Sequence, residues 1–178
     1  EPTALEAAVR LINEAKRMIV LAGEMVAFED ATNELTAFAE ATGAGVMTAY
    51  RQQDAIANDH PAHFGQLTLN RPPFLAEALG ECDLIVNVGS RLDSVTTADY
   101  TMIGDHHRLV MIYPDASAFS QWQPDVALGA HAKPALSAMT AAITNKPPKS
   151  RLTWRDSVHA QEVAFAAPGD IRIEGDVD

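Results

Sequence analysis

The chain has 178 residues, with 13 Lys and Arg against 24 Asp and Glu, so its formal net charge is -11. The length suits one domain with a tail, and the acidity excludes proteins that bind nucleic acid or anionic lipid, because both need clustered positive charge. A single cysteine, Cys82, excludes an internal disulfide and a cysteine zinc cage, and no apolar run is long enough to span a membrane. We therefore expect a cytoplasmic protein with neither nucleic acid nor membrane as a partner.

The first elements along the chain are a helix and a buried strand. Thr3 and Glu6 form a capping-box pattern ahead of apolar residues at helical spacing. These apolar residues are Leu5, Ala8, Val9, Ile12 and Ala15. Residues 18–22 form a continuous apolar run closed by Gly23, which is typical of a strand buried on both faces of a parallel sheet.

The alternation of helix and strand continues along the chain. Asp30 is expected to cap a helix that ends at Gly43, and Pro72 and Pro73 to open another that ends before Gly80. Further strands are predicted at residues 45–49, 83–88, 108–113 and 126–128, and a core-facing helix at 136–143. Alternating elements with short connections indicate a parallel α/β sheet covered by helices on both sides.

The end of the chain breaks this rhythm. Residues 144–150 include Pro147 and Pro148 and look like a linker, residues 151–166 are predicted to form one more helix, and the remainder is an acidic tail. We therefore expect one domain over residues 1–145, followed by a linker, a short helix and a tail over 146–178. Because the sequence opens at Glu1 without an initiator methionine, we also expect it to be a piece of a longer protein.

The candidate binding residues follow the predicted strands. In an open parallel sheet, ligands bind at the carboxyl ends of the strands, where the strand order reverses. Gly23, Gly89 and Ser90 would let backbone approach a ligand there, Arg91 could hold a phosphate or carboxylate, and Asp115 could accept a ribose or adenine hydrogen bond. The same residues fit tight turns, a surface arginine and a turn aspartate equally well.

The patterns of several catalytic classes are missing from the sequence. No GxGxxG follows the first strand, which disfavours an ordinary NAD-dependent dehydrogenase, and no carboxylate pair or nucleophile elbow stands out. The histidines do not suggest a metal site, because His60 and His63 are expected in a loop and the adjacent side chains of His106 and His107 are expected to point apart. Cys82 has no base near it in the sequence and is expected to be a buried, inert thiol.

Four stretches in a fixed order resemble the central domain of thiamine-diphosphate-dependent enzymes, a group that includes acetolactate synthase, pyruvate oxidase and benzoylformate decarboxylase. They are residues 15–23 (AKRMIVLAG), 35–44 (LTAFAEATGA), 60–65 (HPAHFG) and 82–92 (CDLIVNVGSRL). The resemblance runs from about residue 1 to residue 143. It implies a Rossmann-like three-layer sandwich with a mostly parallel sheet of about six strands, in the NAD/FAD-binding topology of deoxyhypusine synthase.

The resemblance also implies cofactors and partners. Thiamine diphosphate and magnesium would be held by two other domains of the parent chain, which bind the pyrimidine and the diphosphate, and the parent would be a homodimer or homotetramer. The run from Gly175 to Val177 lacks the third glycine of the family's magnesium motif. Trp122, Phe119 and Trp154 are expected to lie exposed on faces that neighbouring domains would cover.

Some family members hold FAD or ADP in this domain, and the resemblance then assigns Gly89 and Arg91 to the nucleotide. Here Glu24 stands beside the expected phosphate path and Tyr113 stands where such members carry an aspartate, so repulsion and crowding favour a domain without a nucleotide. We therefore expect an inactive structural domain, with a module for FAD, ADP or CoA as the alternative. An independent NAD-consuming enzyme fits least well, because the sequence has no glycine-rich NAD loop.

Overall fold

The computed structural model describes residues 3–168, and a six-stranded parallel sheet forms their centre. The strand order is β3-β2-β1-β4-β5-β6, which is the order of dinucleotide-binding folds. The strands are β1 (Met18–Ala22), β2 (Gly45–Thr48), β3 (His63–Gln66), β4 (Leu84–Val88), β5 (Arg108–Ile112) and β6 (Val126–Leu128). The expected Rossmann-like sheet of about six strands is confirmed, and every neighbouring pair is parallel.

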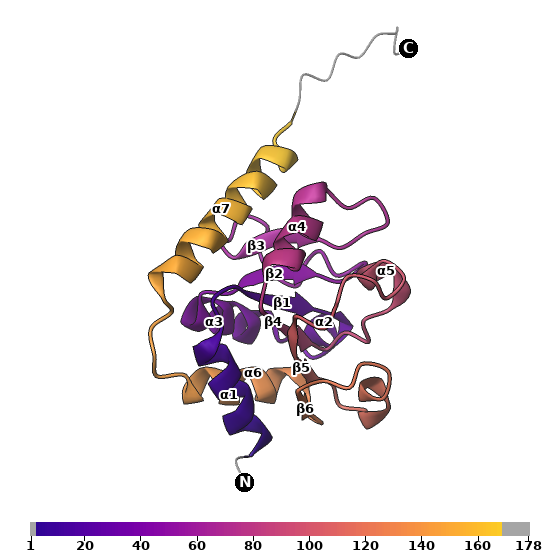
Figure 1. Cartoon of the computed structure of the whole chain (residues 1–178), viewed down its shortest axis with the longest axis vertical. Helices are drawn as coiled ribbons and strands as arrows, with labels where there is room; N and C mark the ends of the chain where they lie inside the picture. Colours follow the sequence, from indigo (N-terminus) through magenta and orange to yellow (C-terminus); the bar gives the residue numbers. More distant parts are fainter. Residues whose placement is uncertain (1–2, 169–178) are drawn as a thin grey trace, which may run out of the picture.

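Helices cover both faces of this sheet, as Figure 1 shows. The helices are α1 (Ala4–Glu14), α2 (Glu24–Phe28), α3 (Thr32–Thr42), α4 (Pro73–Glu81), α5 (Ser94–Thr97), α6 (Ala132–Ala142) and α7 (Lys149–Ala166), with a 3₁₀ turn, η1, at Ala116–Phe119. One core joins α1, α3 and α6 to the sheet, and the other joins α4 and α7 to its opposite face. This is the expected three-layer sandwich.

The central strands supply both cores because successive side chains point to opposite faces. In β1, Val20 faces the core under α1, α3 and α6, whereas Ile19 and Leu21 face the core under α4 and α7. All five residues of β1 and of β4 are buried. The unalternating apolar runs in the sequence are therefore explained by burial on both sides.

The helix boundaries were partly predicted by the sequence. The capping box of Thr3 and Glu6 is confirmed, and Gly43 ends α3 with a φ of 67°. The prediction for Asp30 is wrong, because Ala31 caps α3 and Asp30 takes a φ of 50° in the preceding turn. Gly80 lies inside α4 rather than after it.

Two other predictions are wrong, at His63 and at Trp154. His63 begins strand β3 and is buried, although we expected it in a loop. Trp154 is also buried, because α7 turns it into the core beside β3 and the indole meets the ring of Phe64 edge-on at 5.6 Å. Phe119 and Trp122 are half-buried.

No described helix is both long and apolar enough to cross a membrane. The motif at residues 175–177 lies outside the described residues. The domain boundary at residue 145 remains a prediction.

Candidate functional site

The strand order reverses between β1 and β4, and this is where a parallel sheet of this order can open a crevice. The chain leaves β1 through α2 toward α3 on one face, whereas the segment after β4 packs Met102 and Ile103 against the other face. Four of the candidate residues, Gly23, Gly89, Ser90 and Arg91, lie at the carboxyl ends of these two strands. The structure thus brings them together at the expected crevice.

The two glycines of this crevice are packed against other parts of the chain. A Cβ atom placed on Gly23 would lie 2.4 Å from the Cα of Ser90, and one placed on Gly89 would lie 2.5 Å from the Cβ of Met25. Gly89 has a φ of 69° and its carbonyl oxygen accepts a hydrogen bond of 3.1 Å from the Met25 amide. Ser90 therefore occupies the space beside Gly23, and the first turn of α2 occupies the space beside Gly89.

Hydrogen bonds link three side chains across the same edge of the sheet. The Arg91 Nε donates to the Tyr113 hydroxyl at 2.8 Å, and that hydroxyl donates to the Glu24 Oε1 at 3.1 Å. The Arg91 guanidinium also lies 5.2 Å from the centre of the Tyr113 ring. The bond to Tyr113, aided by the nearby carboxylates, raises the pKa of Arg91. Three elements that are distant in sequence are thus joined across the crevice.

Asp115, the fifth candidate, takes a local role at the start of η1. Its Oδ1 accepts a hydrogen bond of 2.9 Å from the Ser117 amide, and this bond lowers the pKa of Asp115, with a smaller contribution from the charge of Arg91. Its carboxylate is exposed. Asp115 is therefore an exposed charged residue at this edge of the sheet. It interacts with Arg91 electrostatically, without a hydrogen bond between them.

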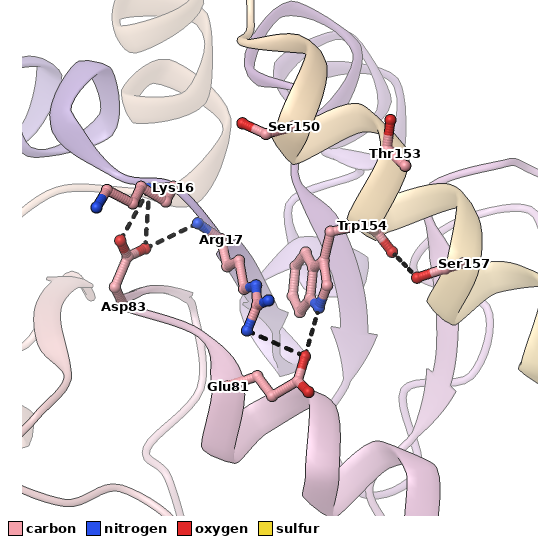
Figure 2. A pocket seen from close by; sticks show the side chains of 8 residues that line it. All are labelled: Lys16, Arg17, Glu81, Asp83, Ser150, Thr153, Trp154 and Ser157. Carbon is pink, nitrogen blue, oxygen red and sulfur yellow. Dashed lines mark hydrogen bonds and ion pairs between the residues drawn. The ribbon is translucent and has the colours of Figure 1, made fainter.

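The opposite, amino-terminal edge of the sheet carries a groove that the sequence did not reveal (Figure 2). It has a volume of about 680 Å³ and lies between the amino ends of β1 and β4 and helix α7. Its lining residues are Lys16, Arg17, Glu81, Asp83, Ser150, Thr153, Trp154 and Ser157. Asp83 was predicted as the first residue of a strand at 83–88, whereas β4 begins at Leu84 and Asp83 lies at the mouth of this groove.

The two acidic side chains of this groove, Asp83 and Glu81, are bonded within the chain. Asp83 accepts hydrogen bonds from the Lys16 amide at 2.8 Å and the Arg17 amide at 2.9 Å. Glu81 meets the Arg17 guanidinium at 3.3 Å and accepts a hydrogen bond of 2.8 Å from the Trp154 indole, as the dashed lines in Figure 2 show. These contacts tie α7 and α4 to the start of β1, which gives the groove a structural role.

The histidines and the cysteine are explained by local contacts. The rings of His106 and His107 lie 3.8 Å apart, so the prediction that they point apart is wrong. They stand in a turn, where strand alternation does not apply, and both face the end of α4, with His107 Nε2 2.9 Å from the Leu79 oxygen. Within residues 3–168 no group of three or more His, Cys, Asp or Glu could hold a metal ion. Burial raises the pKa of the Cys82 thiol, which is free and inaccessible.

Comparison with known protein families finds one model that matches most of this chain. The family is described as the thiamine pyrophosphate enzyme, central domain, and it matches residues 5–139. Among individual relatives, the probable acetolactate synthase large subunit of Methanocaldococcus jannaschii is 25% identical over 89% of this chain. The sulfoacetaldehyde acetyltransferase of Alcaligenes xylosoxydans is 31% identical over 78% of this chain. This chain spans 27% of the length of each of these two relatives.

Comparison with solved structures supports the fold. A Mycobacterium smegmatis protein assigned to the thiamin diphosphate-dependent enzymes superposes with a TM-score of 0.67 at 23% identity. The match covers 82% of this chain and 28% of that one. At this identity the likeness is evidence for the fold alone.

Proposed function

Because this chain belongs to the thiamine pyrophosphate enzyme family, as its central domain, we propose that the longer parent enzyme decarboxylates or ligates 2-keto acids. This domain contributes structure to the parent and holds no catalytic group of its own. Thiamine diphosphate and magnesium are held by the pyrimidine-binding and diphosphate-binding domains of the parent. The parent is a cytoplasmic homodimer or homotetramer.

One observation carries the structural role, namely that the crevice between β1 and β4 is filled by the chain itself. Met25 and Ser90 occupy the space that the two glycines could have offered to a ligand. The Glu24 carboxylate stands at the same place and would repel a diphosphate, since like charges in a partly buried site are unfavourable. These residues do not fit a nucleotide diphosphate, which supports a domain without FAD or ADP.

The relatives support the proposed chemistry of the parent. One is named a probable acetolactate synthase large subunit and another a sulfoacetaldehyde acetyltransferase, so the names of the matched proteins include acetolactate synthesis and acetyl transfer. Both are more than three times as long as this chain, which leaves room for the cofactor-binding domains. We infer that the 178-residue chain alone is inactive.

Two measurements test this proposal. The purified chain, supplied with pyruvate, thiamine diphosphate and Mg²⁺, is expected to show no turnover above the protein-free reaction. Calorimetric titration of the chain with FAD, ADP and CoA, each to millimolar concentration, is expected to release no binding heat. Turnover by the chain would overturn the structural role.

If a nucleotide does release binding heat, the Arg91→Ala variant shows where it binds. Binding that disappears in Arg91→Ala would place the nucleotide at the β1–β4 crevice and support a nucleotide-binding module instead. Binding that persists in Arg91→Ala would point to another site and would contradict both readings of this edge.

A further inference from the structure

The two halves of helix α7 are attached to the domain in different ways. The first half has three buried residues, Arg151, Trp154 and Val158. In the second half, residues 159–166, only His159 and Glu162 are half-buried, and the other residues are exposed. The Phe165 ring lies 6.1 Å from the Phe74 ring, but Phe165 stays 64% exposed. The second half therefore depends for its attachment on two side chains that can gain or lose a proton.

Both of these side chains contact β3, the strand at the edge of the sheet that lies beside α7 in Figure 1. The His159 Nδ1 donates a hydrogen bond of 2.8 Å to the His63 carbonyl oxygen. The Glu162 carboxylate packs against Gly65, since a Cβ atom placed on that glycine would lie 2.8 Å from the Glu162 Oε2. The second half of α7 thus covers the outer side of β3 through one imidazole and one carboxylate.

A third titratable side chain, that of His63, lies at this contact. His63 is 5% exposed, and its Nδ1 is buried without a hydrogen-bond partner among the described residues. Burial, aided by the nearby His159, lowers the pKa of His63. A proton on His63 would add a buried charge and an N–H group without an acceptor, next to a second imidazole. The attached state of α7 therefore disfavours protonated His63.

The elements packed around β3 and the second half of α7 carry few other charged groups, and β2 carries none. They are His60 with Glu40 at 3.4 Å, Arg155 with Asp156 at 2.6 Å, and Glu77 and Glu81 of α4, which line a small groove against α7. His60 and Arg155 each have an acidic partner of their own. His159 therefore remains as the charged neighbour that acts on His63.

The second half of α7 is the part of this surrounding structure that can move at the lowest cost. Strand β2 is buried throughout and pairs with a strand on each side. Segments with few buried contacts open at lower free energy than the core of a domain. If the second half of α7 leaves β3, water reaches His63 while Arg151 and Trp154 still anchor the first half. A protonated His63 can then be hydrated without unfolding of the sheet.

We propose that residues 159–166 form a pH-sensitive latch over the edge of the sheet, which opens when His63 takes up a proton. Opening is favoured as the pH falls through about 6.5, the ordinary value for histidine. Glu162 acts in the opposite sense, because burial raises its pKa and protonation of its carboxylate favours the closed latch. The latch goes beyond the proposed structural role and requires neither a cofactor nor a longer parent.

Hydrogen exchange of the 178-residue chain at pH 7.5 and pH 5.5 tests the proposal. Protection factors, corrected for the effect of pH on free amides, compare the latch with the first half of α7. Protection of the latch is expected to fall several-fold, and at most about tenfold, because one histidine of ordinary pKa gains a proton over this range in the open state. Protection of the first half is expected to stay constant.

Three variants assign the change to particular side chains. His63→Gln is expected to abolish the fall in protection of the latch. Glu162→Gln removes the buried carboxylate, so protection at pH 7.5 is expected to rise and the fall to remain. His106→Gln removes an exposed imidazole and is expected to behave as the unsubstituted chain does. If loss of protection in the first half shows that His63→Gln does not fold, His159→Gln replaces it and is expected to make the fall smaller.

Three results would overturn this inference. An equal fall in both halves of α7 would identify global unfolding in place of a local latch. A constant protection of the latch between the two pH values would show that acid does not open it. A fall that persists unchanged in His63→Gln would show that another group is the trigger. None of these results depends on turnover or nucleotide binding, so the proposed function is tested separately.

Discussion

The Arg151 Nη1 donates a hydrogen bond of 2.7 Å to the carbonyl oxygen of Thr42, the last residue of α3. Its Nη2 donates to the Ile12 oxygen at 2.7 Å and also to the Ala15 oxygen, at the end of α1. Neither helix has a basic residue in its own last turn. A cation from the first turn of α7 therefore meets the carbonyl ends of two helices, where the helix dipole favours positive charge.

Replacing Arg151 by leucine should lower the free energy of unfolding by about 3 kcal/mol, because three buried carbonyl groups lose their donor. The side chain is only 2% exposed, so water cannot readily replace it. Urea unfolding followed by circular dichroism measures the loss. Arg10→Ala is the control, since Arg10 makes an exposed ion pair with Glu14 worth about 0.5 kcal/mol or less. Equal effects of the two substitutions would contradict the anchoring role of Arg151.

Alanine substitutions at Gly89 and Gly80 should change stability in opposite directions. At Gly89 the φ of 69° and a Cβ position 2.5 Å from that of Met25 should cost about 2 kcal/mol. At Gly80, inside α4, an added Cβ would meet nothing within 4 Å, and alanine should stabilise the helix by about 0.5 to 1 kcal/mol. Thermal unfolding checks this: the Tm should fall in Gly89→Ala and rise in Gly80→Ala. A neutral Gly89→Ala would mean that the β1–β4 crevice is open.

Acidification should destabilise the fold through His63. Burial, aided by the nearby His159, lowers the pKa of His63, and its Nδ1 is buried without a hydrogen-bond partner. The unfolded chain then binds the proton more readily, so stability is lost as the pH falls through about 6.5, the ordinary value. Urea unfolding between pH 7.5 and pH 5.5 should show this slope, and His63→Gln should flatten it.

Two further variants distinguish the pH dependence caused by His63 from that caused by other titratable groups. Burial raises the pKa of Glu162, so its contribution is present at low pH and lost as the pH rises through its folded value, opposite in sense to that of His63. In the Glu162→Gln variant, the free energy of unfolding should therefore change more steeply with pH over the range in which Glu162 titrates. His106→Gln removes an exposed imidazole, and an equal flattening in that variant would contradict the assignment to His63.

The sequence predicted the parts of this fold that depend on local pattern. Strands β1 and β4 are continuous apolar runs, and Gly43 ends α3 as expected. Strand β3 was missed because it has four residues, begins at His63 and contains Gly65 with a φ of 116°. Its identity depends on pairing with β2, which the local pattern of these four residues does not reveal.

The candidate site was predictable only in its position. The rule for parallel sheets located Gly23, Gly89 and Arg91 at the carboxyl ends of β1 and β4. Whether that crevice is open depends on contacts between distant segments, such as the bond from Tyr113 to Glu24 across 89 positions. The same limit applies to Arg151, whose partners lie 109 and 139 positions away and leave no local signature.

Helix α7 should prove indispensable to the folded domain, although the sequence pattern put a boundary at residue 145. Arg151, Trp154 and Val158 are buried, and Trp154 and Val158 belong to the core under α4. Loss of a buried tryptophan costs about 3 to 5 kcal/mol, and loss of Arg151 adds about 3 kcal/mol more. Such a sum approaches the total stability of an ordinary domain, which is about 5 to 15 kcal/mol.

A chain ending at residue 145 should therefore lose cooperative urea unfolding and expose the core face of β3. Near-ultraviolet circular dichroism and dye binding to exposed apolar surface measure both changes against the full chain. Trp154→Ala in the full chain is the matched comparison, and it should retain cooperative unfolding at a lower urea midpoint because Arg151 still anchors α7 to α1 and α3. An unchanged midpoint in the truncated chain would restore the boundary at 145. Loss of cooperativity would extend the folding unit to the end of α7.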